Sequence, residues 1–194
     1  MAQQHGGAHA TLADTVWSPA GSAPATRAIV LALIGTALLT LSAKIQVPFW
    51  PVPMTMQTFV VLVLGMAYGW RLAGATVLLY LAQGAIGLPV FAAGGGIAYL
   101  AGPTGGYLAG FLLAAVAVGW LAEHGWDRSV LRTLAAMLIG TAIIFACGIA
   151  WLGTLIGLPQ AISAGLVPFL LGEAVKIALA TAILPFAWRL LQRS

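Results

Sequence analysis

Charged residues are scarce in this sequence. Only 6% of its 194 residues are Asp, Glu, Lys or Arg, whereas an ordinary soluble domain has about 25%. Hydrophobic residues make up 61%, and the mean hydropathy is +1.03. The few basic residues are scattered rather than gathered in a stripe, which argues against a nucleic-acid-binding surface in spite of a pI near 9.7. The composition therefore predicts an all-α polytopic membrane protein.

Cysteine and the common catalytic motifs are also missing. Cys147 is the single cysteine, so no intrachain disulfide can form, and it lacks the Cys and His companions of a metal site. We expect no bound metal and no cofactor. The sequence contains no G-x-x-x-x-G-K-[ST] phosphate loop, so it has no ATP site of this type. Neither G-x-S-x-G nor H-E-x-x-H occurs, which disfavours an intramembrane hydrolase or lipid transferase but leaves it as an alternative.

The first 26 residues are polar and contain no long apolar run. We expect them to form a disordered tail, followed by a single membrane domain at 27–194. The apolar stretch from Arg27 to Leu41 superficially resembles a signal peptide. The many apolar segments that follow favour an uncleaved first transmembrane helix instead.

Interruptions in the apolar sequence delimit the predicted spans, because a spanning helix needs about 20 predominantly apolar residues. The interruptions lie at 44–53, 69–71, 84–103, 123–128 and 153–165. They predict six transmembrane helices, of which the second and third are short. The predicted helices cover residues 27–43, 54–70, 72–88, 103–122, 131–152 and 166–190.

The placement of arginine predicts the orientation in the membrane. Every arginine falls before the first span, after the last span, or in the second or fourth connection. These boundaries all lie on one side, which the positive-inside rule assigns to the cytoplasm, so both termini are expected inside. The opposite connections carry one charged residue, Lys44. The arginines are Arg27, Arg71, Arg128, Arg132, Arg189 and Arg193.

An acidic and a basic residue stand together inside the last apolar run. Glu173 and Lys176 are surrounded by Ala, Val, Leu, Ile and Phe, and their i, i+3 spacing puts them on one helix face. A charge at mid-membrane depth costs roughly 2.5 to 3.5 kcal/mol. Opposite charges retained at this depth usually interact with each other, with a substrate or with an ion. This pair is therefore the strongest candidate for a functional site.

The first two connections on the side opposite the arginines have unusual chemistry. The first contains Pro48, Pro51 and Pro53, which fix an extended, non-helical path, while Phe49 and Trp50 suit an interfacial lid. The second is rich in glycine. Non-helical backbone at membrane depth is tolerated only against protein or a water-filled cavity, which favours a binding site here. The alternative is that these glycines only permit tight turns and close helix packing.

Four segments in this order resemble the BioY family. They are 43–59 (AKIQVPFWPVPMTMQTF), 84–91 (GAIGLPVF), 102–111 (GPTGGYLAGF) and 172–176 (GEAVK). Proteins of that family are the biotin-specific substrate-binding (S) components of energy-coupling-factor (ECF) transporters. The resemblance extends over nearly the whole chain from Arg27 onward.

The resemblance implies a six-helix S-component fold that takes biotin from the outer side into a pocket below the first outer loop. Biotin offers two ureido N–H donors, a ureido carbonyl, an apolar ring and a carboxylate tail. Glu173 would accept from the ureido N–H groups, and Lys176 would donate to one of the two kinds of oxygen. For the aromatic candidates, an interfacial position is an equal alternative. The further candidates for substrate binding are Trp50, Phe91 and Tyr107 as walls, Thr55 and Gln57 as polar contacts, and Thr104 and Gly105 in the GPTGGY segment.

The resemblance also implies partners, because the chain lacks an ATP site of its own. They are a transmembrane coupling subunit and two cytoplasmic ATPase subunits, in the cytoplasmic membrane of a bacterium. Ala28 and Ala32 have the small-xxx-small spacing of a close-packing face for the coupling subunit, although packing within the chain is an alternative. A second alternative for function is an S component for another vitamin, such as riboflavin or thiamine.

Overall fold

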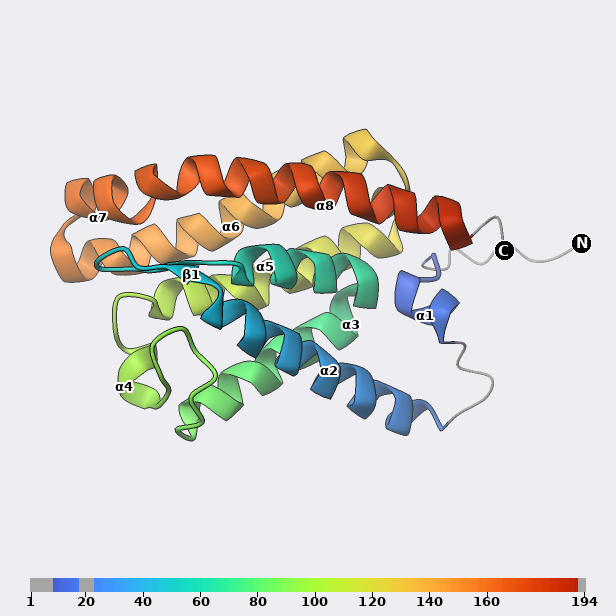
Figure 1. Cartoon of the computed structure of the whole chain (residues 1–194), viewed down its shortest axis with the longest axis horizontal. Helices are drawn as coiled ribbons and strands as arrows, with labels where there is room; N and C mark the ends of the chain where they lie inside the picture. The colour runs from blue at the N-terminus through green and yellow to red at the C-terminus, as the bar shows by residue number, and fades with distance from the viewer. Residues whose placement is uncertain (1–8, 18–22, 192–194) are drawn as a thin grey trace, which may run out of the picture.

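The computed structural model describes residues 9–17 and 23–191, and it consists mainly of long helices (Figure 1). A short antiparallel hairpin pairs Gln46 with Thr55 and Val47 with Met54. The proline-rich segment between these strands forms the turn of the hairpin, and it is not helical, as predicted from its prolines. The elements in chain order are α1 (Leu12–Val16), α2 (Pro24–Lys44), β1 (Gln46–Val47), β2 (Met54–Thr55), α3 (Gln57–Ala85), α4 (Ile97–Leu100), α5 (Gly105–Glu123), η2 (Trp126–Arg128), α6 (Val130–Ile156), α7 (Leu158–Gly165), η3 (Val167–Phe169) and α8 (Leu170–Leu191).

Helix α3 folds back on itself at Gly69. This glycine has φ 75° and ψ 170°, outside the helical region, at the break predicted between the second and third spans. The Gln57 side chain donates from Nε2 to the Tyr80 hydroxyl at 2.7 Å, although the two residues would be about 34 Å apart in a straight helix. The helix therefore consists of two antiparallel arms, 57–68 and 70–85, which Figure 1 shows side by side.

The predicted all-helical membrane fold is confirmed. Five helical stretches in the described part of the chain are long and apolar enough to cross a membrane. The count of six spans stays a prediction, because it treats the arms of α3 as separate spans and each arm is shorter than the about 20 residues that usually cross. The five stretches are Pro24–Lys44, Gln57–Ala85, Gly105–Glu123, Val130–Ile156 and Leu158–Leu191.

The arginines gather at one end of the bundle. The start of α2, the fold in α3, the η2 turn and the end of α8 all lie at this end, and the β1–β2 hairpin, α4 and α7 lie at the other (Figure 1). Arg27 forms an ion pair with Asp14 at 2.8 Å, and Arg128 donates to the Ala10 carbonyl at 3.2 Å. We call these the arginine end and the hairpin end. Arg193 lies outside the described residues.

Part of the predicted disordered tail is folded. The hydroxyl of Thr11 accepts from the Asp14 backbone N–H, while the Asp14 carboxylate accepts from the Thr11 backbone N–H, and this capping box starts α1. Leu12 is buried, and His9 donates from its backbone N–H to the Glu123 carbonyl at 2.7 Å. The expectation of disorder therefore does not hold for this segment, because capping and burial order it. Residues 1–8 and 18–22 lie outside the described residues.

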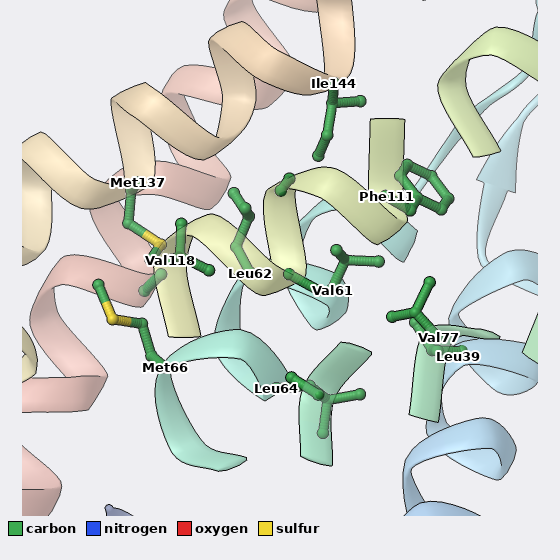
Figure 2. Close-up of a cluster of buried hydrophobic side chains, with 14 of the residues drawn as sticks. Leu39, Val61, Leu62, Leu64, Met66, Val77, Phe111, Val118, Met137 and Ile144 are labelled. Carbon is green, nitrogen blue, oxygen red and sulfur yellow. The ribbon is translucent and has the colours of Figure 1, made fainter. Parts of the chain in front are cut away.

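An apolar core holds the bundle together (Figure 2). Leu39 of α2, Val61 of α3, Val118 of α5 and Ile144 of α6 are fully buried, so four helices contribute to one cluster. Burial of this kind contributes packing contacts that lipid-facing side chains do not have. The core keeps the helices together and sets the positions of their ends around a cavity at the hairpin end.

Candidate functional site

A cavity lies at the hairpin end, between the hairpin, the loop after α3 and the adjoining ends of α3, α5, α6 and α8. The space between its lining atoms is about 480 Å³, including the part that is open to solvent at its mouth. Its lining is mainly apolar, with few polar groups. The lining residues are Val52, Pro53, Thr55, Gln57, Thr58, Phe91, Ala92, Tyr99, Thr104, Tyr107, Leu108, Phe111, Phe145, Phe169 and Glu173.

Aromatic rings form two of its walls. On one side the Phe91 ring stacks on Tyr99 at 5.1 Å between centroids and meets the edge of Tyr80 at 5.4 Å. On the other side Phe145 makes edge contacts with Tyr107 at 5.8 Å and Phe169 at 5.9 Å. Packed aromatic pairs are rigid, so the walls offer a preformed apolar slot for a flat ring.

The position of Phe91 depends on a glycine. The loop after α3 brings the Phe91 ring directly against Gly84, where an added Cβ would overlap three atoms of the ring. Lys44 fixes the same loop by donating from Nζ to the Phe91 carbonyl at 2.6 Å. Phe91 is fully buried as a result, and its ring stays in the wall of the cavity.

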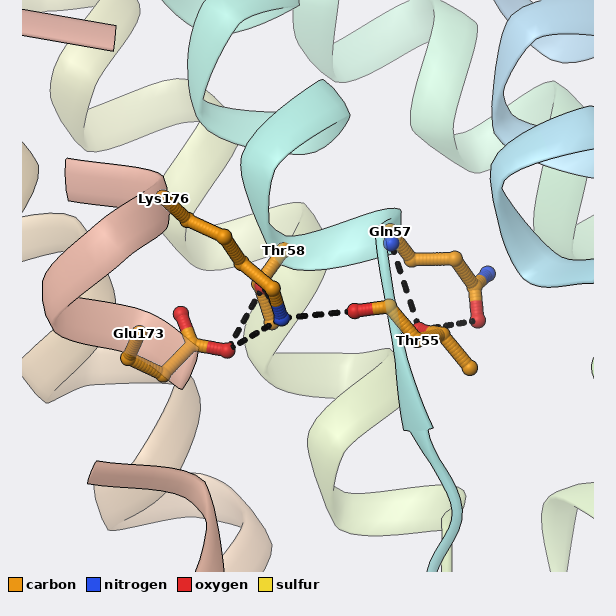
Figure 3. A network of polar contacts seen from close by, with 5 residues as sticks. All are labelled: Thr55, Gln57, Thr58, Glu173 and Lys176. Carbon is orange, nitrogen blue, oxygen red and sulfur yellow. Dashed lines mark hydrogen bonds and ion pairs between the residues drawn. The ribbon is translucent and has the colours of Figure 1, made fainter. Parts of the chain in front are cut away.

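A network of hydrogen bonds links the start of α3 to α8; we call Thr55, Thr58, Glu173 and Lys176 the polar network (Figure 3). The Lys176 ammonium donates to Glu173 Oε1 at 2.7 Å, to Thr58 Oγ1 at 3.0 Å and to the Thr55 carbonyl at 2.6 Å. An ammonium group has three N–H donors. All the donors of Lys176 are therefore used inside the protein.

Only one of the two carboxylate oxygens of Glu173 has hydrogen-bond donors. Its Oε1 accepts from Lys176 and from the Thr58 hydroxyl at 2.9 Å, whereas Oε2 is buried and has no partner among the described residues. The residue is 4% exposed and lines the cavity. A buried acceptor without a donor is costly, so a ligand that supplies an N–H group would be stabilised here.

The remaining polar groups are mostly occupied. Gln57 Oε1 accepts from the Thr55 hydroxyl at 3.2 Å, and Gln57 Nε2 donates to Tyr80, which leaves one amide N–H available. The Tyr107 hydroxyl donates to the Gly165 carbonyl at 2.8 Å. Tyr107 therefore contributes mainly its ring to the cavity.

Most of the candidates from the sequence come together, but three do not line the cavity. Lys176 stands behind Glu173, and Gly105 packs against the Leu100 carbonyl. Trp50 is 85% exposed and does not serve as a wall, whereas its neighbour Phe49 is 39% exposed and contacts the Phe169 ring at 6.0 Å between centroids. Those that line the cavity are Thr55, Gln57, Phe91, Thr104, Tyr107 and Glu173.

Several residues of the site were not identified from the sequence. Thr58 follows Thr55 by three residues, the same spacing as the pair on α8, and this spacing was the available signal. The aromatic lining residues that were missed could not be distinguished from other aromatic residues in the sequence, because many spans of this chain contain such residues. The lining residues missed are Val52, Pro53, Thr58, Ala92, Tyr99, Leu108, Phe111, Phe145 and Phe169.

The predicted docking face on α2 is used inside the chain. Ala32 is 9% exposed and Ala28 is half-buried, and the nearby Gly35 lies against Tyr68 and Thr76 of α3. Small residues on this face let α2 approach α3 closely. The structure thus favours intrachain packing over a coupling-subunit contact at Ala28 and Ala32.

Comparisons with known proteins identify the family of this chain. The model of the BioY family matches residues 10–193. The chain belongs to the BioY family. The biotin transporter BioY of Thermotoga maritima is 44% identical over 163 residues, which cover 81% of this chain and 93% of that protein. The probable biotin transporter BioY of Pyrococcus horikoshii is 36% identical over 156 residues, covering 80% and 92%.

A solved BioY-like structure supports the fold. It is the S-component for biotin from an ECF-type ABC transporter, and it aligns with a TM-score of 0.74 at 25% identity, over 85% of this chain and 92% of that chain. The S-component fold expected from the sequence is therefore confirmed. This member of the BioY family is a multi-pass membrane protein of a transporter family.

Proposed function

We propose that this protein is the biotin-binding S component of an ECF-type transporter. The observation that carries the proposal is the aromatic cavity with one unpaired carboxylate oxygen, Oε2 of Glu173. Biotin combines an apolar bicyclic ring with ureido N–H donors, and the two features of the cavity match those two features of the ligand. The relatives named as biotin transporters support the same substrate.

Glu173 accepts a ureido N–H group through Oε2 in this proposal. Lys176 acts behind it: its three N–H groups are used, so it balances the carboxylate charge and fixes the Glu173 rotamer rather than donating to the ligand. The free amide N–H of Gln57 is a donor for the ureido carbonyl. The bicyclic ring then lies between the walls that contain Phe91 and Tyr107.

The biotin carboxylate pairs with Lys44. Lys44 is the one charged residue in the connections at the hairpin end. Its ammonium lies 2.6 Å from the carbonyl of Phe91, a residue that lines the cavity, as does the adjacent Ala92. Two N–H groups of Lys44 are free for a carboxylate, since the ammonium makes a single hydrogen bond within the described residues.

The chain works with partners in this proposal. The arginine end faces the cytoplasm by the positive-inside rule, so the cavity opens outward and captures biotin from outside a bacterial cell. A transmembrane coupling subunit and two cytoplasmic ATPase subunits drive release inward, because the sequence carries no phosphate-binding loop for ATP. The alternative function, an intramembrane enzyme, is rejected because the matched relatives are named as transporters.

Calorimetry with the purified protein in detergent micelles tests the proposal and separates the vitamins. Biotin should bind with micromolar affinity or better, that is, with about 8 kcal/mol or more. Riboflavin and thiamine should give no heat at the same concentrations. A folded protein that binds one of those vitamins and not biotin would refute the assignment of substrate while leaving the S-component fold intact.

A further inference from the structure

A second hollow lies on the membrane-facing surface, apart from the cavity at the hairpin end, which we call the biotin cavity. We call the second hollow the tryptophan groove. It encloses about 770 Å³ of open space between α3, α5 and α6. It shares no lining residue with the biotin cavity. The lining residues are Trp70, Val116, Ala117, Trp120, Leu121 and Ile139.

The groove is lined by apolar and aromatic side chains, the smallest of which is Ala117. The tryptophans of its rim, Trp70 and Trp120, are 37% and 53% exposed. Gly119 brings α5 against the backbone of Trp70, which keeps the two tryptophans in fixed positions. A hydrocarbon chain fits such a surface, because it needs contact area and no hydrogen bonds.

Positively charged and polar groups stand at the end of the groove nearest the arginine end. The Arg71 guanidinium lies 5.0 Å from the centre of the Trp70 ring and forms no ion pair within the described residues. The His124 ring lies 4.0 Å from the Trp120 ring, and its Nδ1 is bonded to the Trp120 carbonyl at 2.7 Å, which leaves Nε2 free. Each tryptophan of the rim is thus flanked by one cationic or ionisable group.

The nearby carboxylate is already engaged. Glu123 accepts the Trp70 backbone N–H at 3.2 Å and lines a polar hollow together with Asp14 and Arg71. Within the described residues Asp14 pairs with Arg27, and Arg71 forms an ion pair with neither carboxylate. The Arg71 charge is therefore available to a group from the membrane, and the indole N–H groups of Trp70 and Trp120 have no partner within the described residues either.

We propose that the tryptophan groove is a binding site for an anionic phospholipid. One acyl chain lies on Ala117 between the two tryptophans, and the phosphate lies beside the Arg71 guanidinium. The charge selects the occupant: basic pockets between membrane helices on the cytoplasmic side attract anionic headgroups, whereas a zwitterionic lipid gains less from the same groups. The site depends on the membrane fold and not on the assignment of biotin.

Native mass spectrometry of the detergent-solubilised protein tests this site. The protein is titrated with phosphatidylglycerol and with phosphatidylcholine of the same acyl chains. Phosphatidylglycerol should bind about tenfold more tightly, and Arg71→Gln should remove most of this preference. The matched control is Arg132→Gln, an exposed arginine at the same end that does not stack on Trp70 or Trp120, and it should change the ratio less than about twofold.

A second pair of variants tests the acyl chain. Ala117→Phe fills the groove and should weaken both lipids, whereas Ala150→Phe places the same ring on an exposed part of α6 and should not. Size-exclusion profiles and thermal midpoints verify that each variant is folded. Equal binding of the two lipids, or an Arg71→Gln effect no larger than that of Arg132→Gln, would overturn the proposal.

A measurement on the unaltered chain keeps the test independent of folding defects. Lipids with brominated acyl chains quench nearby indoles, so brominated phosphatidylglycerol in mixed micelles should quench tryptophan fluorescence at lower mole fractions than brominated phosphatidylcholine. Trp120→Phe should reduce this difference, because one of the two indole reporters at the rim is lost while Trp70 remains. Identical quenching curves for the two lipids in the unaltered protein would show that the groove holds only bulk lipid and would also overturn the proposal.

Discussion

Glu173 and Lys176 lie one turn apart on α8 and share Oε1 of the carboxylate, at 2.7 Å, but not Oε2. A pair that served only the fold would place donors on both oxygens, since each buried oxygen without a donor is costly. Thr58 adds its hydroxyl to the same Oε1 at 2.9 Å, which makes the asymmetry stronger. The arrangement holds one acceptor ready beside the aromatic cavity.

Replacing both members of the pair separates a binding role from a structural one. The variant Glu173→Leu with Lys176→Met removes both charges, and the protein should stay folded at a cost of about 1 to 3 kcal/mol, because Thr58 and the Thr55 carbonyl lose a donor. Biotin binding should weaken by about 2 to 5 kcal/mol, measured by calorimetry. Unchanged affinity in this folded variant would end the ligand role of Glu173.

The single change Lys176→Met is the control for that experiment. It leaves the Glu173 carboxylate buried without its cation, so the loss of stability should be larger than in the double variant, at about 3 to 5 kcal/mol. Thermal unfolding in detergent measures the order of the two variants. If the single variant proved as stable as the double one, the pair would be solvated and the proposed buried site would be wrong.

The polar part of the site could be predicted from the sequence, because charged residues are rare in an apolar chain. Glu173 and Lys176 stand out for this reason, and Gly69 and the prolines around Trp50 mark real breaks in the helices. Thr55 and Gln57 follow from their place next to such a break. The spans themselves follow from length and apolarity, which do not depend on tertiary contacts.

The apolar walls were harder to predict from the sequence. In a membrane protein the core and the lipid-facing surface are both apolar, so the residue type does not show which of the two a side chain faces. Sequence therefore could not decide that Phe49 contacts Phe169 while Trp50 is exposed, or that Ala32 packs within the chain. The buried surface of α1 was also missed. It depends on a contact between Leu12 and distant parts of the chain, and local polarity does not report such a contact.

Gly84→Ala should disturb the cavity through Phe91. The added methyl group would overlap the Phe91 ring, so the ring must move, with a loss of about 1 to 3 kcal/mol of stability and weaker biotin binding. Gly153→Ala on α6 is the matched control, because its nearest neighbouring atom is 3.5 Å away, and it should be neutral or slightly stabilising. Equal affinities of the two variants for biotin would show that the Phe91 wall does not contact the ligand.

The attachment of α1 should depend on pH in the acid range. Burial alone would raise the pKa of Asp14, but hydrogen bonds from Thr11 and the ion pair with Arg27 outweigh it and hold this pKa below its usual value. A lowered carboxyl pKa stabilises the folded segment above the unfolded value, and this contribution is lost as the pH falls through the folded pKa. Hydrogen exchange of residues 9–17, corrected for intrinsic rates, should stay slow from pH 7 to about 5 and increase below about 4.

Asp14→Asn is the control for the acid transition. It removes the titrating group, so exchange of the α1 segment should already be faster at neutral pH and should no longer change near the pKa of Asp14. An unaltered acid transition in this variant would assign the effect to another group.

Lys44 decides how the tail of biotin is held. If its ammonium pairs with the biotin carboxylate, biotin methyl ester should bind the unaltered protein more weakly by about 1.5 to 3 kcal/mol, the range of hydrogen bonds to charged groups. Lys44→Gln keeps a donor for the Phe91 carbonyl but removes the charge, so this variant should bind biotin and its methyl ester with similar affinity. The loss of discrimination in calorimetry is the diagnostic, because a purely structural role in holding the Phe91 loop would weaken both ligands equally. Discrimination that survives in Lys44→Gln would show that the carboxylate is bound elsewhere, and Lys176 would then have to release one of its bonds in the polar network to reach it.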